Sequence, residues 1–450
     1  MTSTQARLTT GPVGTHLVKM TVPVFFGVFA MMLQGFIDAF FIGMVGDREL
    51  AALSFAFPIL MIVTSVAIGL GAGTSSVVAR AIGANNPERA ARLATDSLLL
   101  SFIITGAFCL IGILTIEILF TALGAPSNMI PLIREYMEVL YVGVPFVVVG
   151  MVGMSSMRAT GDTRLPSLLM IMASITNILL DPLMIFGFGP IPAMGLKGAA
   201  MAALIARGAI FFGTIYLMHE RIHMLTFRMP KLRELQASWK DILHVGIPAA
   251  GTNAIIPIAM ALITAMLAQY GTEAVAGFGV ASRIESLVLV MFYALSAIIG
   301  PFIGQNLSAG KADRIHKALY LCLKFCMSSG LIIALFLLFM SDLLPNLFSD
   351  NIMITETAAL FLLIAPISYG AYGVVMAMNA AFNGMGKPGP AVIISMARMI
   401  VIYVPLAYIL QYFFAISGIF IAYALANILS AFLAYRWAVD SVSGQIDKMS

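Results

Sequence analysis

The sequence predicts an all-α integral membrane protein with twelve transmembrane helices in two pseudo-symmetric six-helix lobes. Hydrophobic residues make up 60% of the 450 residues and charged residues only 10%, whereas soluble domains carry about 25% charged residues. The apolar residues form continuous runs, while the strands of a membrane β-barrel alternate in hydrophobicity. The two halves of the chain also repeat one another in sequence. These three observations together define the fold class.

Each apolar run is long enough to cross a bilayer, which takes about 20 helical residues. In chain order, the twelve runs lie at residues 17–45, 51–78, 93–121, 133–157, 165–188, 197–218, 242–268, 274–302, 318–341, 357–382, 391–412 and 416–437. The longest hydrophilic link follows the sixth run. We therefore expect an N-terminal lobe at 1–218, a cytoplasmic linker at 219–241 and a C-terminal lobe at 242–450.

The loops differ in positive charge on the two sides of the predicted membrane. One side carries most loop lysines and arginines, including those of the linker at 219–241, and the other has little beyond Arg48, Arg134 and Lys197. By the positive-inside rule, both termini lie in the cytoplasm. We expect a multi-pass protein of the bacterial inner (cytoplasmic) membrane without a cleavable signal peptide, because the first apolar run is a full span. The net charge of +4 is spread over the loops, so the expected partner is the lipid bilayer rather than nucleic acid, and we expect a monomer.

The internal repeat has an offset of about 220–225 residues and covers almost the whole chain. LVKMTVP at 17–23 aligns with LHVGIP at 243–248, and RATGDTRLP at 158–166 aligns with FNGMGKPGP at 382–390. Each copy holds six spans and starts in the cytoplasm, which is the pattern of a parallel repeat about an axis along the membrane normal. Two lobes flanking a central cavity are the expected result.

Two acidic residues lie inside predicted spans, Asp38 in the first and Asp181 in the fifth. A carboxylate at the bilayer centre costs about 2.5 kcal/mol or more, so it usually faces a cavity or partner and has a function. Gln34 precedes Asp38 by four residues, and Asn177 precedes Asp181 by four, so each pair shares a helix face. The repeat aligns Asp38 with the apolar Ile263, which indicates that packing alone does not require the acid.

The two acids lie at equal depth, because each precedes the outer end of its span by seven residues, or about 10 Å. Pro182 removes a backbone donor and frees a carbonyl on the fifth span. Carboxylates, carboxamides and carbonyls suit a hard cation. Two neighbouring buried carboxylates are equally suited to hold a proton. A polar cluster that only fixes helix packing is the structural alternative.

Four weaker signals accompany this pair. Arg207 in the sixth span either reaches the acids as a counter-charge or extends towards the cytoplasm. Glu285 in the eighth span is a candidate ion or substrate residue of the C-terminal lobe. Arg398 lies near the cytoplasmic end of the eleventh span and is interpreted as structural. His219 and His223 match the HExxH zinc-enzyme pattern but lie in the basic linker, without an obvious third ligand.

The chain resembles the multidrug and toxic compound extrusion (MATE) family in its twelve spans and in the motifs RATGDTRLP at 158–166 and GLKGAAMAA at 195–203. The resemblance implies export of amphipathic, often cationic compounds in exchange for protons or sodium ions. NorM-type members carry essential acids in helices seven and ten, and here these runs hold no Asp or Glu. The DinF-like branch has an N-lobe site on helices one and five, which corresponds to Asp38, Asn177 and Asp181. Ala203 replaces a hydroxyl residue of that branch in helix six.

The predicted function is therefore multidrug efflux by alternating access, coupled to protons at a site formed by Gln34, Asp38, Asn177, Asp181 and Pro182. Sodium bound by Asp38, Asn177 and Asp181 is the alternative coupling ion, and the missing hydroxyl at Ala203 favours protons. We expect small-molecule drugs as cargo, no enzymatic activity, and no cofactor beyond the coupling ion. A flippase for a lipid-linked saccharide is the alternative function, which a cationic cavity would favour.

Overall fold

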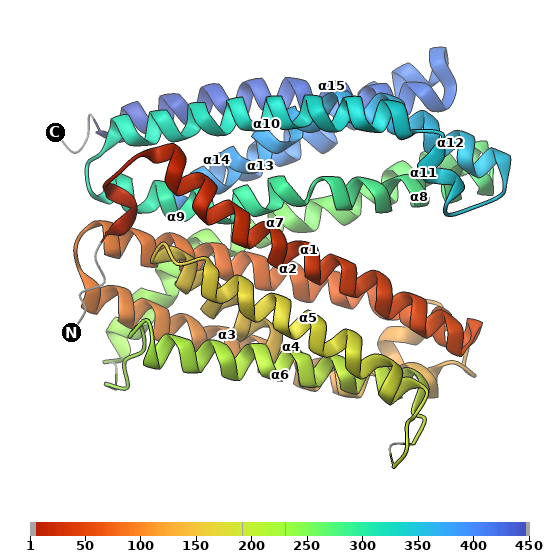
Figure 1. The fold of residues 1–450 in the computed structure, drawn as a ribbon, viewed down its shortest axis with the longest axis horizontal. Helices are drawn as coiled ribbons and strands as arrows, with labels where there is room; N and C mark the ends of the chain where they lie inside the picture. The colour runs from red at the N-terminus through yellow and green to blue at the C-terminus, as the bar shows by residue number, and fades with distance from the viewer. Residues whose placement is uncertain (1–5, 191, 230, 447–450) are drawn as a thin grey trace. The chain divides into compact units, whose positions relative to one another are not determined.

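The computed structural model describes residues 6–190, 192–229 and 231–446, and it is almost entirely helical (Figure 1). Its elements in order are η1 (Arg7–Thr9), α1 (Val13–Val45), α2 (Asp47–Gly83), α3 (Pro87–Ala122), α4 (Ile130–Ala159), α5 (Arg164–Ile185), α6 (Gly195–Glu220), α7 (Leu232–Leu267), η2 (Ala268–Tyr270), α8 (Thr272–Val288), α9 (Val290–Ser308), α10 (Ala312–Met340), α11 (Leu343–Asn346), α12 (Ile352–Ile364), η3 (Ala365–Ser368), α13 (Tyr369–Gly384), α14 (Pro388–Met396), η4 (Ala397–Tyr403) and α15 (Val404–Ile446). The elements η1, η2 and η3 are 3₁₀ turns, and η4 is a π-helix.

Eleven helical stretches among the described residues are long and apolar enough to cross a membrane. The longest, Pro388–Gly444, spans 57 residues and contains a non-helical residue, Ala415, with φ 49°. A Cβ atom added at Gly418 would overlap the backbone of Leu410, so the chain segments before and after Ala415 lie against each other. The chain therefore reverses direction at Ala415. This stretch therefore makes two crossings, which confirms the twelve-helix fold class. The predicted run at 274–302 is one crossing in two pieces, because the helix breaks at Leu289 between α8 and α9.

The first compact unit consists mainly of residues 22–250. Its fourth crossing, α4, packs against α2, α3 and α6, and α5 packs against α6. Gly153 of α4 lets α4 and α6 pack closely, because it has no side chain; a Cβ atom added there would overlap the side chain of Thr214 on α6. Small residues at such contacts let membrane helices approach closely. The unit is therefore built around α4.

The second compact unit contains residues 251–450 and also residues 8–21. Its fourth crossing runs through α12, η3 and α13, and α13 packs against α9, α10 and α15. The fourth crossing of each unit thus contacts the second, third and sixth crossings of the same unit. This shared packing order is the structural counterpart of the sequence repeat.

The first helix of each repeat begins in one unit and ends in the other. In α1 the change lies between Thr21 and Val22, and in α7 it lies between Ala250 and Gly251. Residues 8–21 belong to the second unit, and there Arg314 of α10 donates hydrogen bonds to the carbonyls of Gly11 (2.6 Å) and Leu8 (2.8 Å). The segment that leads into α1, the helix that carries Asp38, is therefore held by α10.

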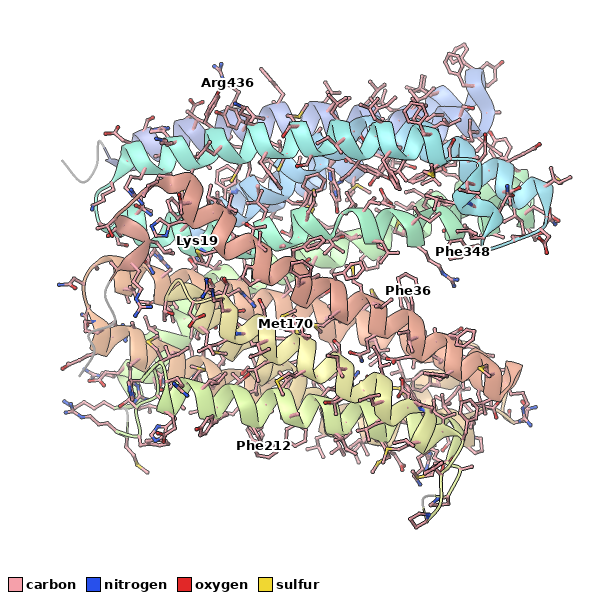
Figure 2. All side chains as sticks on the ribbon, in the orientation of Figure 1. Lys19, Phe36, Met170, Phe212, Phe348 and Arg436 are labelled. Carbon is pink, nitrogen blue, oxygen red and sulfur yellow. The ribbon has the colours of Figure 1, made fainter. Side chains whose placement is uncertain are left out.

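Large apolar side chains cover the outer faces of both units, as a lipid environment requires. Phe212 projects from α6 with 66% of its surface exposed, and Figure 2 shows its position on that helix. Leu114 and Ile118 of α3 and Phe339 of α10 are similarly exposed. By contrast, Gln34 and Asp38 of α1 are half-buried, and Asn177 and Asp181 of α5 are buried.

Candidate functional site: a carboxyl pair between α1 and α5

The middle of α1 and the second half of α5 bring four polar side chains together. Gln34 and Asp38 lie one turn apart on α1, and Asn177 and Asp181 lie one turn apart on α5. The two helices also pack closely nearer the start of α5, where Met170 lies against Gly27 in the middle of α1; Figure 2 labels Met170 on α5. The structure thus places all four sequence-predicted residues in one cluster.

A chain of hydrogen bonds connects the four side chains. The Nε2 group of Gln34 donates to Asp38 Oδ2 at 3.3 Å and to the Oδ1 atom of Asn177. Asn177 Nδ2 in turn donates to Asp181 Oδ1 at 3.0 Å. One amide group has two hydrogens, so Gln34 makes both bonds at once. Each carboxyl group is therefore oriented by a carboxamide.

One oxygen of each carboxyl group remains without a hydrogen-bond donor. These atoms are Asp38 Oδ1 and Asp181 Oδ2, and both are buried. The two carboxyl groups also lie within hydrogen-bonding reach of each other. Two carboxyl groups can hydrogen-bond directly only when one of them carries a proton. This arrangement can accommodate one proton between the two carboxyl groups.

The same geometry offers few oxygens to a metal ion. The carboxamides of Gln34 and Asn177 turn N–H groups towards the acids, and the Asn177 oxygen is occupied by Gln34. Hard cations such as Mg²⁺ and Ca²⁺ take about six to eight oxygen ligands. The two unpartnered carboxylate oxygens alone fall short of that number, so a cation at this site would need further oxygens, such as the carbonyl that Pro182 frees.

Arg207 of α6 lies within electrostatic reach of Asp38 and of Tyr136 on α4. Its guanidinium packs beside Gly143 of α4. The electrostatic interaction with Asp38 fits a counter-charge role for Arg207, which stays a prediction. Tyr136 is a residue that the sequence did not single out, because a buried tyrosine in an apolar span resembles ordinary core packing.

Pro182 lies inside α5, and the helix continues past it to Ile185. Proline has no N–H group, so the helical partner of the Ile178 carbonyl is missing directly beside Asn177. A Cβ atom added at Gly35, next to Gln34 on α1, would have no neighbouring atom within 4 Å. The proline therefore affects the backbone of the site, whereas Gly35 is not required by a close contact.

Glu285 is far from this pair in sequence and belongs to the second unit. It is buried, with 8% of its surface exposed, and accepts a hydrogen bond from the Tyr423 hydroxyl at 2.9 Å. Arg398, which the sequence suggested to be a structural residue near the cytoplasm, is also buried and interacts electrostatically with Glu285. The structure therefore brings together two charged residues that the sequence left unrelated.

The HExxH residues of the linker show local contacts. His219 Nε2 lies 3.4 Å from Glu220 Oε1, and the His219 ring packs on Phe227. Among the described residues, no group of three His, Cys, Asp or Glu side chains is placed to hold a metal ion.

Comparison with known proteins identifies the fold and the repeat. The family model MatE matches the chain twice, at residues 23–183 and 248–409, which confirms the internal duplication. A FAD transporter of Shewanella oneidensis is 37% identical over 96% of this chain and 95% of its own length. The probable multidrug resistance protein YoeA of Bacillus subtilis is 27% identical over 87% of this chain and 86% of its own length.

Among solved structures, the bent form of the Vibrio cholerae MATE transporter VcmN has a TM-score of 0.91 at 31% sequence identity. The match covers 96% of this chain and 98% of the VcmN chain. The sequence resemblance, the duplicated family match and the shared fold lead to one conclusion: the chain belongs to the MatE family of transporters, the multidrug and toxic compound extrusion proteins.

Proposed function

We propose that this protein is a proton-coupled exporter of small organic molecules in the bacterial inner membrane, with both termini in the cytoplasm. The observation that supports it is the pair of buried, unpartnered oxygens of Asp38 and Asp181. A bound proton neutralises the carboxylate charge, and its release restores that charge. The protonation state thus changes how α1 packs against α5, and cargo binding favours one of the two packings.

The first candidate cargo is FAD, since the relative with 37% identity is named a FAD transporter. Amphipathic drugs are the second candidate, because several relatives at 22–28% identity are named multidrug resistance or export proteins. The acidic pair would attract the positive charge that many such drugs carry. The position of the pair on the first and fifth crossings supports assignment to the DinF-like branch.

Reconstituted transport tests the coupling ion directly. Purified protein in liposomes would be given a pH gradient at equal sodium, or a sodium gradient at equal pH, with FAD or a cationic dye as cargo. We expect the pH gradient alone to drive export and the Asp38→Asn variant to lack it. Export driven only by the sodium gradient would refute proton coupling and favour sodium at Asp38, Asn177 and Asp181.

A further inference from the structure

A second buried polar cluster lies within the C-terminal unit. It combines two opposite charges with aromatic, hydroxyl and carboxamide side chains, and its members come from five elements. We call it the Glu285–Arg398 cluster, and its members are Glu285, Ser368, Tyr372, Arg398, Tyr423 and Asn427. Proton coupling at Asp38 and Asp181 makes no use of this cluster.

Hydrogen bonds hold the Arg398 guanidinium in a fixed position. Its Nη1 group donates to Asn427 Oδ1 at 2.8 Å, and Asn427 Nδ2 donates to Ser368 Oγ at 3.0 Å. Ser368 Oγ in turn donates a hydrogen bond to the Ala365 carbonyl at 2.8 Å. The guanidinium carbon lies 4.6 Å from the centre of the Tyr372 ring. The arginine is therefore both oriented and covered by an aromatic face.

The cluster retains hydrogen-bonding capacity that the protein does not use. Arg398 Nε is buried without a partner, and Arg398 forms no ion pair within 4 Å among the described residues. Glu285 is occupied by Tyr423 instead. A cluster that served packing alone would pair its two charges, because uncompensated buried charges are costly. The Nε donor of Arg398 thus remains for another molecule, and the Glu285 carboxylate, which has about four acceptor sites, can accept more than the Tyr423 bond.

Three irregular backbone segments meet at this cluster. The break at Leu289 comes four residues after Glu285, and the 3₁₀ turn η3 contains Ser368. Arg398 itself lies in the π-helix η4. Short π-helical segments inside α-helices occur frequently at functional sites. In secondary transporters, interrupted helices line the substrate and ion sites. The backbone therefore points to ligand binding independently of the side chains.

The chemistry of the cluster narrows the class of ligand. Glu285 disfavours a phosphate, and Arg398 disfavours a cationic drug. Tyr372 and Tyr423 provide aromatic faces, and Tyr423 packs against Phe361 with a ring distance of 6.0 Å. An uncharged planar ring that carries a carbonyl next to an N–H group satisfies both charged residues. The pyrimidine edge of a flavin ring has this pattern, with an N–H group between two carbonyls.

We infer that the Glu285–Arg398 cluster is a cargo subsite for an uncharged heteroaromatic ring. Arg398 donates to a ring carbonyl, Glu285 accepts from the adjacent ring N–H, and Tyr372 stacks on the ring in place of its present contact with the guanidinium. The inference rests on the proposed export function and specifies which part of a flavin cargo the C-terminal unit recognises.

Riboflavin binding to the purified full-length protein tests this subsite, because riboflavin has the ring without the phosphates. Quenching of flavin fluorescence would report its affinity. We expect Arg398→Gln to weaken riboflavin binding at least tenfold and Tyr372→Leu to weaken it severalfold. Arg436→Gln, which changes an exposed arginine of α15 in the same unit (Figure 2), should bind as the wild type does.

A riboflavin analogue methylated on the ring N–H separates recognition from packing. The analogue should bind at least tenfold more weakly than riboflavin to the wild type, and the two should bind equally to Glu285→Gln. A structural role of Glu285 would leave the penalty for methylation unchanged, and that result would refute the subsite. If Arg398→Gln fails to fold, the comparison of the analogue between the wild type and Glu285→Gln still decides the matter.

The outcomes for this subsite and for proton coupling are separable. Asp38→Asn should lose export but retain riboflavin binding. A wild-type protein that exports a cationic dye on a pH gradient yet binds no riboflavin would overturn the subsite and leave the coupling proposal intact. Riboflavin binding by a wild-type protein that exports nothing on a pH gradient would overturn the coupling proposal and leave the subsite intact.

Discussion

The carboxyl groups of Asp38 and Asp181 each keep one buried oxygen that no donor reaches. Leaving a buried polar atom unpaired costs about 1–3 kcal/mol, so the fold retains an unfavourable feature that a shared proton would relieve. The carboxamides of Gln34 and Asn177 hold the other two oxygens in place. The residues of this cluster therefore act as one unit rather than as four separate contacts.

Joint action predicts a specific pattern for double variants. Asp38→Asn and Asp181→Asn should each reduce proton-driven export at least tenfold, and the double variant should be no worse than the more damaging single change. Flux in proteoliposomes measures this, with Glu117→Gln, an exposed acid on α3, as the control. Losses that multiply would show that the two acids act independently.

Asn177 supports the pair through hydrogen bonds to both helices. Asn177→Ala removes the partner of Gln34 and of Asp181, so we expect a loss of about 1–3 kcal/mol in unfolding free energy. Gln34→Ala combined with Asn177→Ala should cost less than the sum of the single changes, because the shared bond is lost only once. Thermal unfolding in detergent would measure the differences, and strict additivity would contradict the shared network.

Among the elements, the sequence predicted α1 to α6 well, because each is one continuous apolar run. The breaks were harder to foresee. The interruption at Leu289 lies in an apolar segment without proline or glycine, and the π-helix that carries Arg398 has no sequence signal. The reversal at Ala415 falls in the short gap predicted between the last two runs. The partners of Arg398 could not be predicted for this reason, since linear depth in a span does not show which neighbours a side chain meets.

Close helix packing gives a prediction for α4 and α6. Gly153→Val would force a side chain into Thr214, whereas Gly208→Val on α6 would place one where no atom lies within 4 Å of its Cβ position. Overpacking a close contact costs about 1–3 kcal/mol, so the first variant should unfold at a clearly lower temperature than the second. Equal melting temperatures for the two variants would contradict the close α4–α6 contact.

The hydrogen bonds from Arg314 of α10 to the segment before α1 give a further prediction. Arg314→Gln removes donors to the carbonyls of Leu8, Thr10 and Gly11. We expect amide hydrogen exchange at residues 8–11 to become severalfold faster, while α4 remains protected. Arg436→Gln serves as the control, and unchanged exchange in Arg314→Gln would show that other contacts hold the segment.

For the whole molecule, composition and repetition were enough to predict the twelve-helix fold, because a membrane leaves few ways to satisfy the backbone. The sequence also located the acidic pair, since isolated charges stand out in apolar spans. The sequence did not single out Tyr136 and Asn427, because uncharged polar residues are common inside helical bundles. Side-chain partnerships across helices depend on rotation about each helix axis, which a linear pattern does not fix.

The orientation of the whole molecule follows from loop charge and remains a prediction. Met229, 92% exposed in the linker, should be cytoplasmic, and the exposed Asp350 before α12 should be external. A membrane-impermeant thiol reagent on intact cells should modify Asp350→Cys and spare Met229→Cys until the cells are opened. The native cysteines are buried and give little background. The reverse pattern would invert the topology.

The exchange of helix beginnings between the two units bears on how the duplicated chain arose. If a six-helix ancestor formed a dimer, the start of each copy's first helix would have packed in the other copy, as in a domain-swapped dimer. Fusion of the two copies would then have kept this exchange. Pro23 and Pro248 lie at aligned positions beside the residues where α1 and α7 change unit. A chain severed near residue 229 should consequently yield two fragments that are each unstable alone and regain transport only when they are produced together.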